Sequence, residues 1–338
     1  MNRAGSGSNL PSGGGSNGMD TLGQRLLVLE PQYRERVWGG QRLQRSDPPI
    51  GEAWIAYGPS VVGNGPHAGE TLDALMASHS TALMGTAVAK RYPARFPILI
   101  KLLDCADWLS VQVHPNDEQA RRLVGPDEFG KTEAWYFLKA EPGAGILAGV
   151  KPDVDRATLA AAIREGRVLD VVEHVEIRSG DSLLIPAGTL HALGPGLLLY
   201  EIQQASDTTY RAYDWGRPQS TGRRLHIEES VEVTEPVGPA DRIHPEVTAG
   251  TGAASAMDCA LFDVDLVRVS PSMPWSSDTC GRSFHIVTVT EGTAELTCGQ
   301  ERVRLGKFET ALVAGSAGAY EVCAVDERVS LLRATVPD

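Results

Sequence analysis

The chain has 338 residues, of which 42% are hydrophobic and 22% charged, an ordinary globular composition in a chain long enough for two domains. Its formal net charge of −12 argues against nucleic acid and anionic membranes as partners. The five cysteines include no CxxC pair, which argues against a disulfide framework or a zinc knuckle. No signal peptide or transmembrane run is recognisable, so we expect a cytoplasmic protein.

Residues 1–18 are rich in Gly, Ser and Asn, and we expect a disordered tail there. The segment 19–236 predicts a domain of short strands and turns, interrupted by three helices. The strands are expected at Leu26–Leu29, Ile98–Leu103, Ser110–His114, Ala134–Lys139, Glu176–Ile185 and Leu197–Gln203, and the helices at Thr71–Met84, Asn116–Leu123 and Asp153–Glu165.

Polar residues interrupt three of the predicted strands. Lys101 lies in the apolar run FPILIKLLD, so it must snorkel, form an ion pair or line a cavity. The segment LSVQVHP then places Gln112 and His114 two residues apart, which puts them on one face of a strand. The motif GKTEAWYFL gives Lys131 and Glu133 the same spacing. Taken alone, that motif is a common pattern of a solvated, ion-paired strand edge.

The segment Ile177–His191 contains Gly180, Pro186, Gly188 and His191 in the pattern Gly-x5-Pro-x-Gly-x2-His, which resembles the second half of the cupin signature. The proline ends a strand because it lacks a donor, and the second glycine permits a tight bend. The following strand would carry the histidine into a barrel. Together with the upstream amide, imidazole and carboxylate, this histidine predicts a site for zinc, iron or manganese. The alternative is a pair of barrel histidines that are only hydrogen-bonded.

Charged residues are dense in SDTTYRAYDWGR, which holds Asp207, Arg211, Asp214 and Arg217. Loops that directly follow a barrel strand often carry functional residues, so a site is predicted here. The alternative is a surface loop with an internal ion pair.

Residues 237–256 predict a linker, and the segment 257–338 predicts a second barrel of short strands. Ala317 stands where the spacing of the first domain would put the counterpart of His191. We therefore expect two diverged repeats, the second of them without a metal site.

From about Leu26 onwards, the chain resembles the type I mannose-6-phosphate isomerase (phosphomannose isomerase) family in its short bacterial form. The resemblance rests on four ordered motifs, FPILIKLLDCADWLSVQVHPND, GKTEAWYFL, IPAGTLHALG and EIQQASDTTYRAYDWGR, with VWGGQRL and GEAW before them. It is weak after Pro236. One departure follows GEAW, where residues 55–57 read Ile-Ala-Tyr and the family usually has an acidic residue and then a serine nearby.

The resemblance implies a mainly β fold of two cupin (jelly-roll) β-barrel domains, with a few helices inserted in the first. It implies an aldose–ketose isomerase that interconverts mannose 6-phosphate and fructose 6-phosphate through a cis-enediol. It implies one zinc ion per chain, with Gln112, His114, Glu133 and His191 as its ligands. The implied catalytic residues are Arg211, Lys101 and Lys131, and the residues expected to bind substrate are Ser110, Asp207 and Arg217.

Several points stay open in the sequence. Arg211 cannot be the base, because a guanidinium stays protonated at neutral pH. The proton could be moved by Lys101, Lys131, Glu133, Asp207 or a bound water, and a desolvated lysine near zinc would have a lowered pKa. An iron-dependent cupin oxygenase and a non-catalytic sugar-binding cupin are the alternative functions. The oligomeric state is also open.

Overall fold

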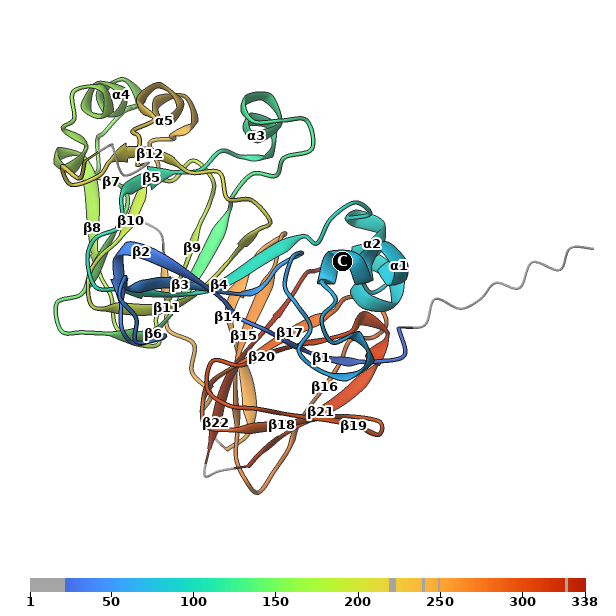
Figure 1. The fold of residues 1–338 in the computed structure, drawn as a ribbon. Coiled ribbons are helices and arrows are strands. Elements are labelled where there is room, and N and C mark those ends of the chain that lie inside the picture. Colours follow the sequence, from blue (N-terminus) through green and yellow to red (C-terminus); the bar gives the residue numbers. More distant parts are fainter. Residues whose placement is uncertain (1–21, 219–222, 239–240, 249, 326–327) are drawn as a thin grey trace, which may run out of the picture.

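The computed structural model describes residues 22–218, 223–238, 241–248, 250–325 and 328–338, so the expected tail at residues 1–18 lies outside it. The fold is mainly β, as predicted, and its strands form four antiparallel sheets that pack in two pairs (Figure 1). Within the described ranges, no helix is both long and apolar enough to cross a membrane.

The first pair of sheets contains seven and five strands. The seven-stranded sheet has the order β13-β9-β6-β11-β4-β2-β3, and the five-stranded sheet the order β12-β5-β10-β7-β8. The strands span β2 Gln32–Gly40, β3 Ile50–Ala56, β4 Ile98–Cys105, β5 Val111–Val113, β6 Glu133–Ala140, β7 Gly145–Val150, β8 Val172–Glu176, β9 Ser182–Ile185, β10 His191–Leu193, β11 Leu197–Gln204, β12 Tyr210–Tyr213 and β13 Arg242–Ile243.

The second pair contains six and four strands, in the orders β1-β20-β17-β22-β15-β14 and β16-β21-β18-β19. Its strands span β1 Leu26–Leu29, β14 Gly252–Asp258, β15 Asp263–Val269, β16 Trp275–Asp278, β17 His285–Glu291, β18 Ala294–Cys298, β19 Glu301–Leu305, β20 Thr310–Val313, β21 Ala319–Ala324 and β22 Val329–Thr335.

The seven-stranded sheet is buried on both faces, and all eight residues of β4 are buried. Successive residues of a strand point to opposite faces. Leu103 therefore joins the core between the seven- and five-stranded sheets, while Ile100 and Leu102 join a core that extends to the six-stranded sheet. This second core also takes apolar residues from α1 (Leu72–Met84) and α2 (Thr86–Arg91).

Helices α4 (Arg156–Arg164) and α5 (Ile227–Val233) cover the outer face of the five-stranded sheet through a separate apolar core. Helix α3 (Asp117–Leu123) begins at a capping box made by Asn116 and Gln119. The predicted helix at Asp153–Glu165 begins later, because Asp155 is its N-cap.

Four sequence-based expectations are corrected by the strand pairing. Strand β1 pairs with β20, so it belongs to the second pair of sheets and not to the first. The segment 237–256, expected as a linker, contains β13 and the start of β14. The strand expected at Glu176–Ile185 is two strands, β8 and β9, in different sheets. The charged segment after β11 is not wholly a loop, because it contains β12.

Candidate active site

A polar cavity of about 540 Å³ opens between the two sheets of the first pair. Five basic side chains line it: Arg36, Lys101, Lys131, Arg211 and Arg223. The acidic side chains in the lining include Glu52, Glu201 and Asp207. With Glu35, the lining holds four acidic and five basic side chains, so the cavity is slightly basic in a chain that is acidic as a whole, and its cationic groups can bind a small anionic substrate.

Three side chains from neighbouring strands of the five-stranded sheet form one row. Gln112 on β5 lies opposite His191 on β10 and opposite Arg211 on β12. Residues directly opposite in an antiparallel pair project to the same face. The sheet therefore brings an imidazole, an amide and a guanidinium together from positions 112, 191 and 211, which span 99 residues of sequence.

The cupin-like turn holds the two histidine-bearing segments against each other. Gly188, with φ of 87°, donates its backbone N–H to His114 O at 2.9 Å. A left-handed conformation of this kind favours glycine, since other residues meet steric strain there. The short motif thus fixes the relative position of both imidazoles.

Both imidazoles are held with Nε2 toward the same point. His114 donates from Nδ1 to Thr208 O at 2.9 Å, and His191 donates from Nδ1 to Thr189 O at 2.9 Å. A proton on Nδ1 leaves Nε2 of a neutral ring as a lone pair. Burial, followed by the charge of the nearby Lys131 ammonium, lowers the pKa of His114 to about 3, so this ring is neutral at pH 7.

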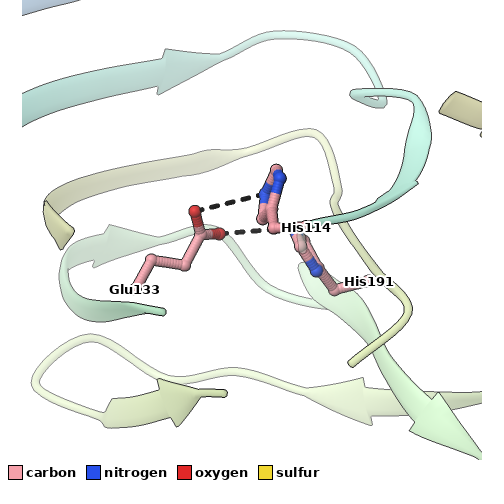
Figure 2. A group of neighbouring side chains, drawn as sticks. All are labelled: His114, Glu133 and His191. Atoms are coloured by element: carbon pink, nitrogen blue, oxygen red, sulfur yellow. Dashed lines mark ion pairs between the residues drawn. The ribbon is translucent and has the colours of Figure 1, made fainter. Parts of the chain in front are cut away.

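The Glu133 carboxylate faces those two lone pairs (Figure 2). Its oxygens lie 3.4 Å from His114 Nε2 and 3.2 Å from His191 Nε2. Burial alone would raise the pKa of Glu133, but Lys131 and the two histidines hold it well below its usual value. Ionised oxygen and neutral imidazole nitrogen are both acceptors, so this arrangement needs a cation.

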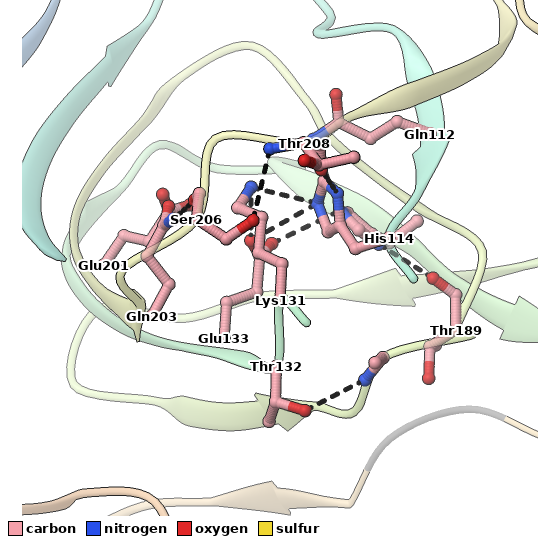
Figure 3. A network of polar contacts seen from close by, with 12 residues as sticks. Gln112, His114, Lys131, Thr132, Glu133, Thr189, Glu201, Gln203, Ser206 and Thr208 are labelled. Carbon is pink, nitrogen blue, oxygen red and sulfur yellow. Dashed lines mark hydrogen bonds and ion pairs between the residues drawn. The ribbon is translucent and has the colours of Figure 1, made fainter. Parts of the chain in front are cut away.

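Lys131 supplies the positive charge seen at this point. Its Nζ lies 3.0 Å from His114 Nε2 and 2.9 Å from Glu133 Oε2 (Figure 3). Neither oxygen of the buried carboxylate has a hydrogen bond of good geometry. The donor set of two imidazoles and one carboxylate is the kind that binds catalytic zinc. Ligand atoms around tetrahedral zinc lie about 3.4 Å apart, close to the separations observed here.

Gln112, the expected fourth ligand, does not direct its oxygen toward these groups. Its Nε2 lies 3.3 Å from His191 Nε2, and its Oε1 accepts a hydrogen bond from Ser110 at 3.2 Å. A half-turn of the amide would bring the oxygen to the histidine side. Gln112 is therefore adjacent to the three converging groups in a non-ligating orientation.

Lys101 lies in the cavity wall, where it is paired. Its ammonium donates to Glu201 Oε1 at 3.0 Å and to Gln203 Oε1 at 2.7 Å. Burial alone would lower the pKa of Lys101, but Glu201 and Glu52 reverse that effect and raise it. The lowered pKa that the sequence suggested for this lysine is wrong, and Lys101 is a fixed positive charge at neutral pH.

Arg211 differs from the other arginines in the cavity. Arg36 pairs with Glu52 at 2.7 Å, and Arg223 makes two hydrogen bonds to Asp214 at 2.7 and 2.8 Å. By contrast, the buried Arg211 Nε has no hydrogen-bond partner within the described residues. Burial, followed by the charge of Arg223, lowers the pKa of Arg211. Its guanidinium is the one best placed to bind an anion that enters the cavity.

Ser110 and Asp207 line the cavity as expected, whereas Arg217 does not. Arg217 pairs with Asp107 at 2.7 Å and Asp214 at 3.1 Å, and it also donates to the backbone of Trp108. Its two carboxylate partners hold it as a structural ion pair. The expectation that Arg217 binds substrate has no support from this geometry.

The sequence-based interpretation missed Arg36, Arg223 and Glu201 as cavity residues. Glu201 begins the motif EIQQ, which was noted only as part of the resemblance. Arg36 lies in the cavity lining because β2 lies over the cavity. Arg223 is held in the lining by its hydrogen bonds to Asp214. No spacing in the sequence signals either arginine.

Comparisons with known proteins agree with this site. The sequence profile described as "Phosphomannose isomerase type I, catalytic domain" matches residues 26–133. A mannose-6-phosphate isomerase of Streptococcus mutans is 35% identical over 294 residues, which cover 83% of this chain and 90% of the relative. The Bacillus subtilis mannose-6-phosphate isomerase ManA is 35% identical over 287 residues, which cover 81% of this chain and 88% of the relative.

Solved structures give the same assignment. The crystal structure of the mannose 6-phosphate isomerase from Bacillus subtilis matches with a TM-score of 0.81 at 29% identity, covering 92% of this chain and 99% of that one. A zinc-bound mannose 6-phosphate isomerase shares the fold, with a TM-score of 0.74 at 16% identity over 93% of this chain and 100% of that one. From the sequence identity, the coverage and the shared fold, we conclude that the chain belongs to the type I mannose-6-phosphate isomerase family and is an isomerase.

Proposed function

We propose that the protein interconverts mannose 6-phosphate and fructose 6-phosphate with one zinc ion bound per chain. The observation that carries this proposal is the convergence of two imidazole nitrogens and an ionised carboxylate on one point, beside a cavity lined by five Lys and Arg side chains. His114, Glu133 and His191 would hold the ion, with Gln112 as a fourth ligand after its amide turns. Bound zinc supplies a Lewis acid that polarises the sugar carbonyl and stabilises an enediolate.

The remaining residues would bind and orient the substrate. Arg211 is unpaired and lies beside Gln112 in the sheet, so its fork would bind negative charge that develops on the enediolate oxygens. Lys101 would add a fixed positive charge to the wall. Ser110 would orient the substrate or the Gln112 amide through its hydroxyl.

A cis-enediol pathway needs one group to move a proton between C1 and C2. Lys101 is unsuitable because its pKa is raised, and Glu133 because its pKa is held low and its oxygens face the histidines. Lys131 and Asp207 are the cavity side chains that remain for this step, besides a bound water.

The test is a coupled isomerase assay with mannose 6-phosphate, together with metal analysis of the purified protein. We expect stoichiometric zinc, loss of turnover on chelation and recovery when zinc is returned. An oxygen electrode run in parallel should record no substrate-dependent oxygen consumption. Zinc-loaded protein that binds the sugar phosphate without turnover would instead identify a non-catalytic sugar-binding protein.

A further inference from the structure

A second polar cavity, of about 440 Å³, lies between the two pairs of sheets. Tyr136 and Lys139 of β6 line it from the first pair. Arg268 of β15 and Lys307 of the turn between β19 and β20 line it from the second pair. This interbarrel groove is distinct from the cavity that holds the proposed zinc site, because no residue lines both.

The lining of the groove holds three Lys and Arg side chains and one acidic side chain. Lys139, Arg268 and Lys307 form no ion pair with any carboxylate of the described residues, and Glu291 is the one acidic residue in its lining. His244 also lines the groove and is hydrogen-bonded to Asp181 at 2.9 Å. The chain has a net charge of −12, so three cationic side chains without an ion pair around one cavity form a positive region on an acidic protein.

The hydroxyl of Tyr136 is the second observation that indicates a ligand. The residue is only 8% exposed, and its hydroxyl forms no hydrogen bond with the part of the chain that the structure describes, although this oxygen is not among the fully buried atoms. Burial raises the pKa of Tyr136 while nearby Arg268 opposes that rise, so the hydroxyl stays a neutral donor. The hydroxyl is therefore a donor that a ligand or water in the groove can accept from.

Most of the hydrogen-bond donors of Arg268 have no partner within the described residues. Its Nη1 makes one long contact, 3.4 Å, with Val247 O, and no other side-chain hydrogen bond of this residue is formed within the described ranges. A guanidinium fork matches the paired oxygens of a phosphate or a carboxylate. The groove therefore offers a planar charged donor, a neutral hydroxyl and two exposed ammonium groups.

We propose that the interbarrel groove binds a small, multiply charged oxyanion, such as a phosphorylated metabolite, at a site separate from the catalytic cavity. Arg268 and Tyr136 donate the directional hydrogen bonds. Lys139 and Lys307, both exposed, contribute attraction that weakens with salt. Because the groove is built from both pairs of sheets, its ligand would contact both.

The test is isothermal titration calorimetry of zinc-loaded, full-length protein with inorganic phosphate, and separately with succinate, at low ionic strength. Arg268→Ala should weaken phosphate binding by roughly tenfold or more, since it removes a charged donor. Tyr136→Phe should weaken it several-fold and leave the melting temperature unchanged, because the hydroxyl has no partner in the fold. Arg304→Ala is the matched control, an exposed arginine of β19 outside the groove.

An Arg211→Ala background separates this groove from the catalytic cavity. Phosphate binding that survives Arg211→Ala and is lost on adding Arg268→Ala supports the proposal, whatever the variant does to turnover. Binding of phosphate but not succinate supports a site for phosphate groups, and binding of both supports a site for oxyanions generally. The proposal is overturned if wild-type protein binds neither anion, if Arg268→Ala and Arg304→Ala bind equally well, or if Arg211→Ala abolishes all binding.

Discussion

Two backbone carbonyls determine the chemistry of the histidines in the site. Thr208 O and Thr189 O accept the Nδ1 protons of His114 and His191, so both rings present Nε2 to Glu133. Outer hydrogen bonds of this kind fix tautomer and ring orientation in metal sites. The same tautomer leaves these buried acceptors in need of a cation when the carboxylate is ionised.

His191→Ala should lose zinc and isomerase activity together. Loss of an outer partner lowers metal affinity roughly 10–100-fold, and removal of a ligand should cost more than that. Zinc content by mass spectrometry and turnover in the coupled assay measure the two losses. His174→Ala removes an exposed histidine outside the site and should keep both. Full zinc content in folded His191→Ala protein would contradict the proposed ligand set.

Arg211→Ala should keep stoichiometric zinc and lower kcat. Loss of one donor aimed at a developing oxyanion costs roughly 10²–10³ in rate, about 3–4 kcal/mol. Arg211→Lys should restore little, because an ammonium does not reproduce the planar fork. Steady-state kinetics on the zinc-loaded variants decide the role. A raised KM with unchanged kcat would mean that Arg211 contributes uniform binding, for example to phosphate.

Strand β6 shows how one element serves the site and the core at once. Glu133 faces the cavity side, and Trp135, on the same face, donates from Nε1 to Glu201 at 3.1 Å. Ala134 and Tyr136 alternate with them and belong to the core shared with the six-stranded sheet. The alternation of side chains along a strand therefore predicts which residues share a face. It does not predict which other elements pack against either face.

Strand β17 carries a histidine whose burial should make stability depend on pH. His285 is 4% exposed, its Nδ1 lies 2.9 Å from Tyr320 Oη, and burial lowers its pKa to about 3. Between about pH 6.5 and 3 the unfolded chain binds a proton here that the folded chain does not. The free energy of unfolding should therefore fall as pH falls through that window.

The His285 contribution should approach about 1.4 kcal/mol per pH unit well below pH 6.5. Urea unfolding of wild type and His285→Gln between pH 7 and 4.5 measures the difference, in which the other titrating groups cancel. The variant should show the shallower pH dependence by about that amount. Parallel curves for the two proteins would mean that this histidine is protonated in the folded state.

At the scale of the whole molecule, the two pairs of sheets are joined in two ways. They share one apolar core, to which Ile100 and Tyr200 contribute from the first pair and Leu266 and Leu332 from the second. In addition, β1 from the amino-terminal part of the chain completes the six-stranded sheet of the second pair. Neither pair of sheets can be removed without exposing a buried apolar face of the other.

The protein should therefore unfold in a single cooperative transition. Tryptophan fluorescence reports mainly on the first pair, since Trp275 is the only tryptophan in residues 257–338. Far-ultraviolet circular dichroism reports on the strands of both pairs. The two probes should give coincident urea midpoints. Midpoints that differ would show that the barrels unfold independently.

The fold class, the family resemblance and the three groups His114, Glu133 and His191 could be predicted from the sequence. These depend on local patterns: a two-residue spacing along a strand and a glycine–proline turn of fixed length. Such patterns are set by backbone geometry within a few residues, so they can be recognised before the chain is folded.

Three features required the folded structure. Strand β1 joins the second pair of sheets, and Arg217 is held by carboxylates outside the cavity. Among the arginines that line the cavity, Arg211 is the one whose buried Nε has no partner within the described residues. The folded structure also decided the charge state of Lys101, because Glu201 and Glu52 reach that lysine across strands. Strand partners and ion pairs join residues far apart in sequence. Which strands pair and which charges meet depends on how all the apolar faces and charged groups of the chain are buried together. A single segment of sequence does not contain that information.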